Sequence, residues 1–204
     1  MKNMIAMLLV AVMALSMAAC TGANNTDTTT TPATTTPATT TPATTAPQVQ
    51  GPASALEALT NTWALFGEDE KFFVGGGDYN NMVMDAPGAV DLTVVDYLTG
   101  TLLVPEAQVA NITECASLMH GMIANNFTCG AFKVSDVNAF ATAMKDAIKN
   151  NQWICGMPEK MTIVDLGGSY VVVAFGINDA MNPFFTKLAN AYPGATTLVD
   201  EAIA

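Results

Sequence analysis

The chain contains no arginine and little positive charge of any kind. Its seven basic residues are all lysines, against 18 aspartates and glutamates, and its net charge is -11. Without guanidinium groups it lacks the side chain that binds phosphate bidentately, and its acidity repels nucleic acid. We therefore expect no nucleic-acid partner. The same acidity excludes attraction to an anionic membrane surface, so membrane attachment needs another cause.

The chain also lacks a hydrophobic run long enough to span a bilayer. Its first apolar run is Met4–Met17, broken only by Ser16, whereas a spanning helix needs roughly 20 apolar residues. Lys2 supplies a short positive segment in front of this run. The arrangement is typical of a cleaved export signal, and we predict that residues 1–19 are a signal peptide.

A cysteine follows the predicted signal directly. Met17-Ala18-Ala19-Cys20 resembles the lipobox of bacterial lipoproteins, with methionine where that family usually has leucine. The resemblance implies that the Cys20 thiol receives a diacylglycerol and becomes the first residue after cleavage. The protein would then be anchored at the extracytoplasmic face of a bacterial membrane without spanning it. The alternative is an ordinary secretory signal followed by a chance cysteine.

Residues 20–52 are rich in threonine and proline and almost free of large apolar side chains. The repeat TTTPATTTPATTTPATTAP cannot bury enough surface to offset its ordering entropy. We interpret this segment as a disordered spacer with the lipidated cysteine at its start. Proline-rich chain extends by about 3.1 Å per residue, so the spacer could reach on the order of 100 Å.

Residues 53–204 have the composition of a single globular domain. Ser54 and Glu57 form a capping box before a predicted helix that ends near Gly67. Apolar spacing predicts a short helix near 92–98. A further helix is predicted from the cap at Asn111 to about Asn125.

The second half of this domain predicts the order β-α-β-β-α. FTCGAFKV reads as a strand, Ser135 as the cap of a helix, and MTIVDL and SYVVVAFG as two strands joined by a glycine hairpin. Asn182-Pro183 is expected to start the last helix. The predicted fold is α+β, a two-layer sandwich in which an antiparallel or mixed sheet carries helices on one face. YVVVAFG is apolar nearly throughout, so we expect it at the centre of the sheet.

These features together carry a second resemblance. The chain resembles uncharacterised lipoproteins of Gram-positive anaerobes. The resemblance rests on the lipobox, the low-complexity spacer, CGAFKV, the capped helix, the glycine turn and YVVVAFG. That family is defined by a domain of unknown function. The resemblance implies a surface lipoprotein and supplies no active residues.

Gly75-Gly76-Gly77-Asp78 is a candidate ligand loop. No Gly-Lys-Ser/Thr follows it, which argues against a phosphate loop, and the ligand spacing of a calcium-binding EF-hand loop is absent. The glycines could still let the backbone approach a ligand closely. The alternative is a plain surface loop.

His120 is the only histidine and the single weak candidate for catalysis. A hydrolase would pair it with a carboxylate such as Glu114 or Asp78. No serine or cysteine motif supplies a nucleophile, so a surface histidine is the favoured interpretation. We expect no catalytic residue, no cofactor and no metal, because zinc would require scattered thiols to meet this histidine.

Three thiols follow Cys20 in the chain. Cys129 and Cys155 lie in or beside predicted strands, so a disulfide between them is one interpretation, favoured over Cys115–Cys129. Three reduced, buried thiols are the alternative. The chain has no Cys-x-x-Cys, which argues against a thioredoxin-like redox role.

The favoured function is a non-catalytic binding domain on a membrane-anchored stalk, whose ligand is a cell-surface protein, a glycan or a small molecule. A cell-envelope hydrolase using His120 is one alternative. A transporter's substrate-binding lipoprotein is another, although such proteins have two lobes, and about 150 residues suit a single domain.

Overall fold

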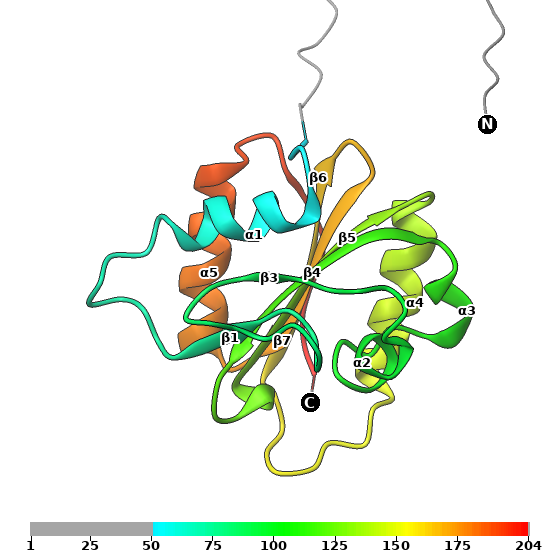
Figure 1. Cartoon of the computed structure of the whole chain (residues 1–204), viewed down its shortest axis with the longest axis horizontal. Helices are drawn as coiled ribbons and strands as arrows, with labels where there is room; N and C mark the ends of the chain where they lie inside the picture. Colours follow the sequence, from blue (N-terminus) through cyan, green and yellow to red (C-terminus); the bar gives the residue numbers. More distant parts are fainter. Residues whose placement is uncertain (1–50, 204) are drawn as a thin grey trace, which may run out of the picture. The chain divides into compact units, whose positions relative to one another are not determined.

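A single antiparallel sheet organises the part of the chain that the structure, a computed structural model, describes, residues 51–203. Seven of its eight strands run in the order β2-β1-β4-β5-β7-β6-β8, and the eighth, β3, pairs with β4. In Figure 1 the strands cross the centre of the domain, with helices beside them. The strands are β1 (Val74–Gly76), β2 (Val83–Met84), β3 (Gly88–Ala89), β4 (Ile112–His120), β5 (Phe127–Val134), β6 (Lys160–Gly167), β7 (Tyr170–Gly176) and β8 (Thr196–Ala202). The helices are α1 (Ala55–Trp63), α2 (Val95–Gly100), α3 (Glu106–Val109), η1 (Ala124–Asn126), α4 (Val137–Lys149) and α5 (Asn178–Ala191).

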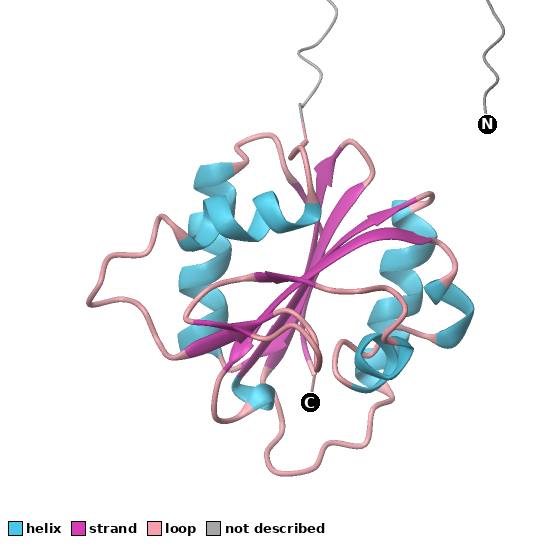
Figure 2. Cartoon of the chain, in the orientation of Figure 1, coloured by secondary structure: helices cyan, strands magenta, loops and turns pink. Residues whose placement is uncertain are grey.

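Side chains alternate between two cores, one on each face of the sheet. In β7, Val172 and Ala174 pack with α1 and α5, whereas Val171 and Val173 pack with α4 and α2. Figure 2 shows these helices on opposite sides of the strands. The α+β class and the antiparallel sheet are therefore confirmed. The helices cover both faces rather than the one we expected, so the sheet is the middle of three layers.

The order β-α-β-β-α is confirmed as β5, α4, β6, β7 and α5. β7 lies between β5 and β6, the central position expected from its apolar sequence. The glycine hairpin is also present: Gly167 ends β6 with φ of 80°, and Gly168 and Ser169 form the turn to β7 with φ of 62° and 72°. Such left-handed backbone is open to glycine at no steric cost. The order continues into β8, an edge strand that we did not predict.

The predicted helix over residues 111–125 is wrong. This segment is the strand β4, paired with β5 over most of its length. Cys115, Leu118, Met119 and Met122 match helical spacing, but residues 115–118 are buried on both faces of the sheet. A strand covered on both faces is nearly all apolar, so it loses the alternation that would identify it.

The last helix starts earlier than predicted. α5 begins at Asn178, whose backbone N–H donates to the Glu159 carboxylate at 2.7 Å, and Pro183 lies inside the helix. The cap comes from a residue before β6, which local sequence does not reveal. Similarly, Asp136 rather than Ser135 caps α4, accepting from the Ala139 N–H.

The first described residues lie at one end of the sheet. Gly51 packs against the β6–β7 turn: a Cβ added to it would lie 2.4 Å from the Gly167 carbonyl oxygen. From there Ser54 caps α1, accepting from the Glu57 N–H at 3.0 Å as predicted. The strand ends His120, Phe127 and Lys160 lie at the other end of the sheet. At about 3.3 Å per residue, strands of this length separate the two ends by roughly 25 Å.

Candidate functional site

Two of the residue groups singled out in the sequence meet at that far end. The glycine loop, Asp78 and His120 line one cavity of about 120 Å³, which we call the methionine pocket. Its remaining walls are apolar or aromatic: Phe73, Tyr79, Met82, Met84, Tyr97 and Met119, with Gly121.

The glycines are required by close backbone approach. A Cβ on Gly76 would lie 2.2 Å from the Gly88 nitrogen, and one on Gly77, at φ of 85°, would lie 2.0 Å from the Asn81 carbonyl oxygen. The loop therefore folds onto β3 and onto its own following turn. Gly75 differs, because its added Cβ would meet only the Val83 carbonyl oxygen, at 3.7 Å. That position faces the pocket and has room for a side chain.

Asp78 holds the loop rather than a ligand. It is 1 % exposed, and its carboxylate accepts from the backbone N–H groups of Asn80, Asn81 and Asp91 at 2.8–3.1 Å. Burial alone would raise the pKa of this carboxyl, but these hydrogen bonds outweigh it and hold the pKa below its ordinary value. Both oxygens are thus committed to backbone, which leaves little capacity for a general base.

His120 ends β4 and fastens the next turn. Its Nδ1 accepts from the N–H groups of Met122 and Ile123, both at 3.2 Å, and its ring stacks on Phe72 with centroids 5.8 Å apart. Because Nδ1 accepts these hydrogen bonds, the proton of the neutral ring lies on Nε2. A metal-ligating histidine instead donates its second N–H to an acceptor. The contacts of His120 therefore suit a structural imidazole with one N–H to offer, not a metal ligand.

Tyr97 closes the pocket from behind. It is fully buried, and its hydroxyl donates to Ser117, which in turn donates to the Gly77 carbonyl oxygen at 2.6 Å. Burial raises the pKa of Tyr97 to about 12. The Tyr79 ring packs edge-on against it at 5.0 Å. This chain of hydrogen bonds fixes the glycine loop against β4.

Glu114, the other carboxylate considered for catalysis, lies far from His120. The two residues are six positions apart in β4, roughly 20 Å along the strand. Glu114 pairs with Lys133 at 3.0 Å and accepts from Ala55 N–H and the Tyr170 hydroxyl. Burial would raise its pKa, but these partners lower it below the ordinary value. It ties α1 to the sheet, so a pair with His120 is excluded.

The Cys129–Cys155 disulfide is absent, and all three described cysteines are free thiols. Cys129 is completely buried under α1 and α5, whereas Cys155 is exposed in the loop before β6. Cys115 is buried in the opposite core, beneath α2 and α4. The pleat of the sheet thus separates the two buried thiols, and burial raises the pKa of both. Cys20 lies outside the described residues.

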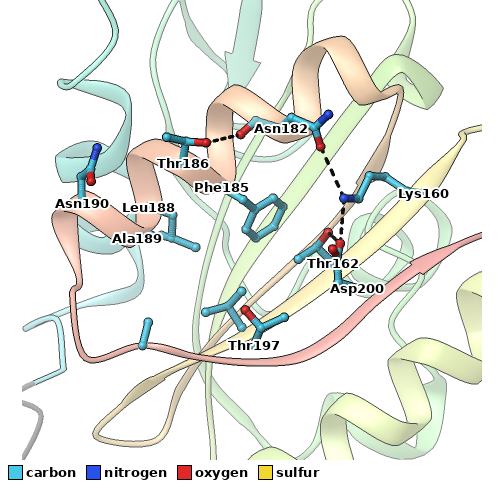
Figure 3. Close-up of a pocket in the computed structure, with 12 residues that line it drawn as sticks. Lys160, Thr162, Asn182, Phe185, Thr186, Leu188, Ala189, Asn190, Thr197 and Asp200 are labelled. Carbon is cyan, nitrogen blue, oxygen red and sulfur yellow. Dashed lines mark hydrogen bonds and ion pairs between the residues drawn. The ribbon is translucent and has the colours of Figure 1, made fainter.

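A second, larger cavity lies beside α5. It is a groove of about 500 Å³ with a mixed polar and apolar lining, between α5 and the strands β6 and β8. Figure 3 shows Phe185 projecting into it from the helix. At one end Lys160 pairs with Asp200 at 2.8 Å and donates to Asn182 at 3.4 Å, and Thr162 also donates to Asp200 (Figure 3). The one cation of this groove is therefore already neutralised.

The same is true of every lysine that the structure describes. Each forms an ion pair with a carboxylate: Lys71–Glu68, Lys133–Glu114, Lys145–Glu201, Lys149–Glu201, Lys160–Asp200 and Lys187–Glu70. The remaining described carboxylates have no lysine partner. The surface of the domain therefore carries acid without a matching base.

Exposed apolar side chains that the sequence did not predict gather at the same end of the sheet as the methionine pocket. We call this surface the methionine patch; its exposed members are Phe73, Met82, Met84, Met122, Ile123, Ile154 and Met157. Met122 is 80 % exposed and Ile154 77 %. Hydrogen bonds join the segments that carry them: Gly121 N–H donates to Phe73, and the Asn125 amide donates to Ile154 and Gly156. The one available signal was the cluster of methionines in a loop rich in glycine and asparagine.

No family model, no curated protein and no solved structure matches this chain. Among residues 51–203, no helix is long and apolar enough to cross a membrane. Within the same residues, no three His, Cys, Asp or Glu side chains gather as a metal site would require. The lipobox, the signal peptide and the spacer up to residue 50 lie outside the described residues, so these assignments stay predictions.

Proposed function

We propose that this protein is an extracytoplasmic lipoprotein that is anchored through Cys20 and presents a non-catalytic binding domain on a flexible stalk. One observation carries the binding role: the methionine pocket and patch form an exposed apolar surface at the end of the sheet opposite Gly51. Exposed apolar surface of this kind marks interaction sites in soluble domains.

The position of Gly51 gives this surface an orientation. The chain enters the domain beside the β6–β7 turn, whereas the pocket lies where β4 ends, roughly 25 Å away along the strands. A tether that arrives at the first end leaves the second end free. A spacer that reaches on the order of 100 Å would carry that free end well beyond the lipid headgroups.

The hydrolase alternative has one observation in its favour, since His120 and Asp78 line the same pocket. The contacts of both residues weigh against it, because each is occupied in holding backbone. His120→Gln separates the two functions: a hydrolase should lose roughly a hundredfold or more of its turnover, whereas a binding domain should lose only the one hydrogen bond that His120 offers and bind its ligand somewhat more weakly. A two-lobed transporter protein is disfavoured because a single sheet with two cores accounts for the described residues.

Anchoring is tested by growing cells that express the chain with radiolabelled palmitate. We expect label on the wild-type protein and none on Cys20→Ser, which should also leave the membrane fraction. Cys155→Ser is the matched control and should keep both label and location. Equal labelling of Cys20→Ser, or an unlabelled wild type, would overturn the proposal.

A further inference from the structure

The methionine pocket has the size of an anchor site. Small-molecule sites usually enclose about 300–1,000 Å³, whereas this cavity holds about 120 Å³. A space of this size suits one apolar side chain. In protein interfaces the strongest contacts are such buried anchors, surrounded by weaker contacts that exclude water. The methionine patch around the pocket has the arrangement of that surrounding ring.

The side chains of the patch suit a protein partner. Four of its seven members are methionines, and methionine adapts its shape to the surface it meets. The pocket adds one fixed polar group, the Nε2–H of His120 in the neutral ring, which can donate to a backbone carbonyl oxygen. An apolar side chain beside a peptide carbonyl would satisfy both features.

Charge defines the partner further. Asp85 follows Met84 directly, is exposed, and pairs with no lysine among the described residues. Glu159, two residues after Met157, is already occupied in capping α5 through the Asn178 N–H. The one described lysine in the adjoining cleft, Lys71, is already paired with Glu68 at 2.7 Å. A partner with lysine or arginine would meet the unpaired Asp85 carboxylate here. Complementary charge of this kind sets specificity and speeds association.

We propose that the methionine patch binds a protein segment with one large apolar side chain, which enters the methionine pocket, flanked by lysine or arginine. The inference rests on the proposed function as a binding domain and names its partner class. Two other occupants are less suitable. An anionic lipid surface would be repelled by the acidic domain, and a second copy would bring the two unpaired Asp85 carboxylates face to face.

The test uses the full lipidated chain in phosphatidylcholine nanodiscs, with empty nanodiscs as the blank. Three fluorescent twelve-residue peptides serve as probes: alternating lysine and leucine, alternating glutamate and leucine, and alternating lysine and serine. We expect the lysine–leucine peptide to bind at least tenfold more tightly than either of the others, measured by fluorescence anisotropy. Its affinity should fall with added salt, because exposed charges are screened.

Two pairs of variants locate the site. Gly75→Leu fills the pocket from a position with room for a side chain, and Gly100→Leu, where nothing lies within 4 Å of an added Cβ, is its control. Met122→Gln removes an exposed patch side chain, and Leu65→Gln, 44 % exposed and outside the patch, is its control. We expect Gly75→Leu to weaken binding at least tenfold and Met122→Gln about threefold, with both controls unchanged and circular dichroism spectra matching the wild type.

Several outcomes would overturn the inference. Equal binding of the glutamate–leucine peptide would refute the charge requirement, and equal binding to Gly75→Leu would refute the anchor pocket. Binding of domains to each other or to anionic vesicles, in place of the peptide, would assign the patch to a second copy or to lipid. None of these results tests the lipid anchor, because palmitate labelling of Cys20 tests the anchor separately.

Discussion

At the residue scale, the chemically reactive side chains of this domain serve its structure. Asp78, His120 and Glu114 were the sequence candidates for chemistry, and each instead holds backbone or bridges elements. Residue type alone could not distinguish these roles. A carboxylate that ties down a glycine loop and one that abstracts a proton look alike until their partners are known.

Asp78→Asn should destabilise the domain by about 1–3 kcal/mol at pH 7, because an amide nitrogen would face backbone N–H donors in a buried site. The folded pKa of Asp78 lies below its ordinary value. Its contribution is therefore complete above the unfolded pKa, about 3.9, and is lost as the pH falls through the folded value. Urea titrations from pH 7 to pH 2 should show the difference between the two proteins shrinking.

Asp69→Asn is the control for this series, since Asp69 is an exposed carboxylate in the loop after α1. It should change stability by less than about 0.5 kcal/mol. A gap between wild type and Asp78→Asn that stayed constant down to pH 2 would contradict the role assigned to the ionised carboxylate.

Cys155 should be the only described thiol that reacts with maleimide in the native protein. It is exposed, whereas Cys115 and Cys129 are buried and have raised pKa values, so they lack accessible thiolate. Peptide mass mapping should find label at Cys155 alone before unfolding, and at all three thiols in urea. If Cys155 of the native wild type took label only after reduction, the result would show that Cys155 forms a disulfide.

At the scale of elements, the sequence predicted best where a segment follows a single periodic pattern. Helices α1 and α4 have clear caps and one apolar stripe, and the β6–β7 hairpin has its glycine turn. The prediction for β4 failed because both faces of this strand are covered. That burial depends on the tertiary structure, which the local sequence does not reveal. The same holds for α5, whose cap comes from Glu159, in the loop before β6.

Pro183 offers a test at this scale, because it lies exposed inside α5. Proline has no N–H, so the Asp179 carbonyl loses its helical donor. Pro183→Ala should therefore stabilise the domain by about 1–3 kcal/mol in urea unfolding. Asn190→Ala, on the exposed surface of the same helix, should gain no more than about 0.7 kcal/mol. Equal effects of the two changes would show that the proline costs α5 nothing.

The candidate site was predictable only in part. The glycine loop was recognised as unusual, and His120 as a singular residue, but their meeting in one pocket depends on the pairing of β1 with β4. The patch arises from four segments: Phe73 before β1, Met82 and Met84 after β1, residues 122–123 after β4, and residues 154–157 before β6. Its methionines resemble core residues in composition, and only the fold shows that they are exposed.

At the scale of the whole molecule, the described domain has two ends that differ in character. The described chain begins at one end of the sheet, and the apolar surface lies at the other. The domain carries acidic charge without a matching base, and we propose that this charge keeps it from anionic lipid. A tethered domain with these properties would hold its binding surface away from the membrane.

Energy transfer from a donor dye on Cys155 to acceptor lipids tests this arrangement most directly. Cys155 is exposed in the loop that carries Ile154 and Met157, so its dye reports the position of the patch. With the full lipidated chain in vesicles, we predict weak transfer from the dye on Cys155. A second protein carries Ser169→Cys, in the turn beside Gly51, together with Cys155→Ser, and we predict stronger transfer from a dye on its new cysteine. Strong transfer from Cys155, equal to or above that from the Ser169 position, would show that the apolar end rests on the membrane and would contradict the account.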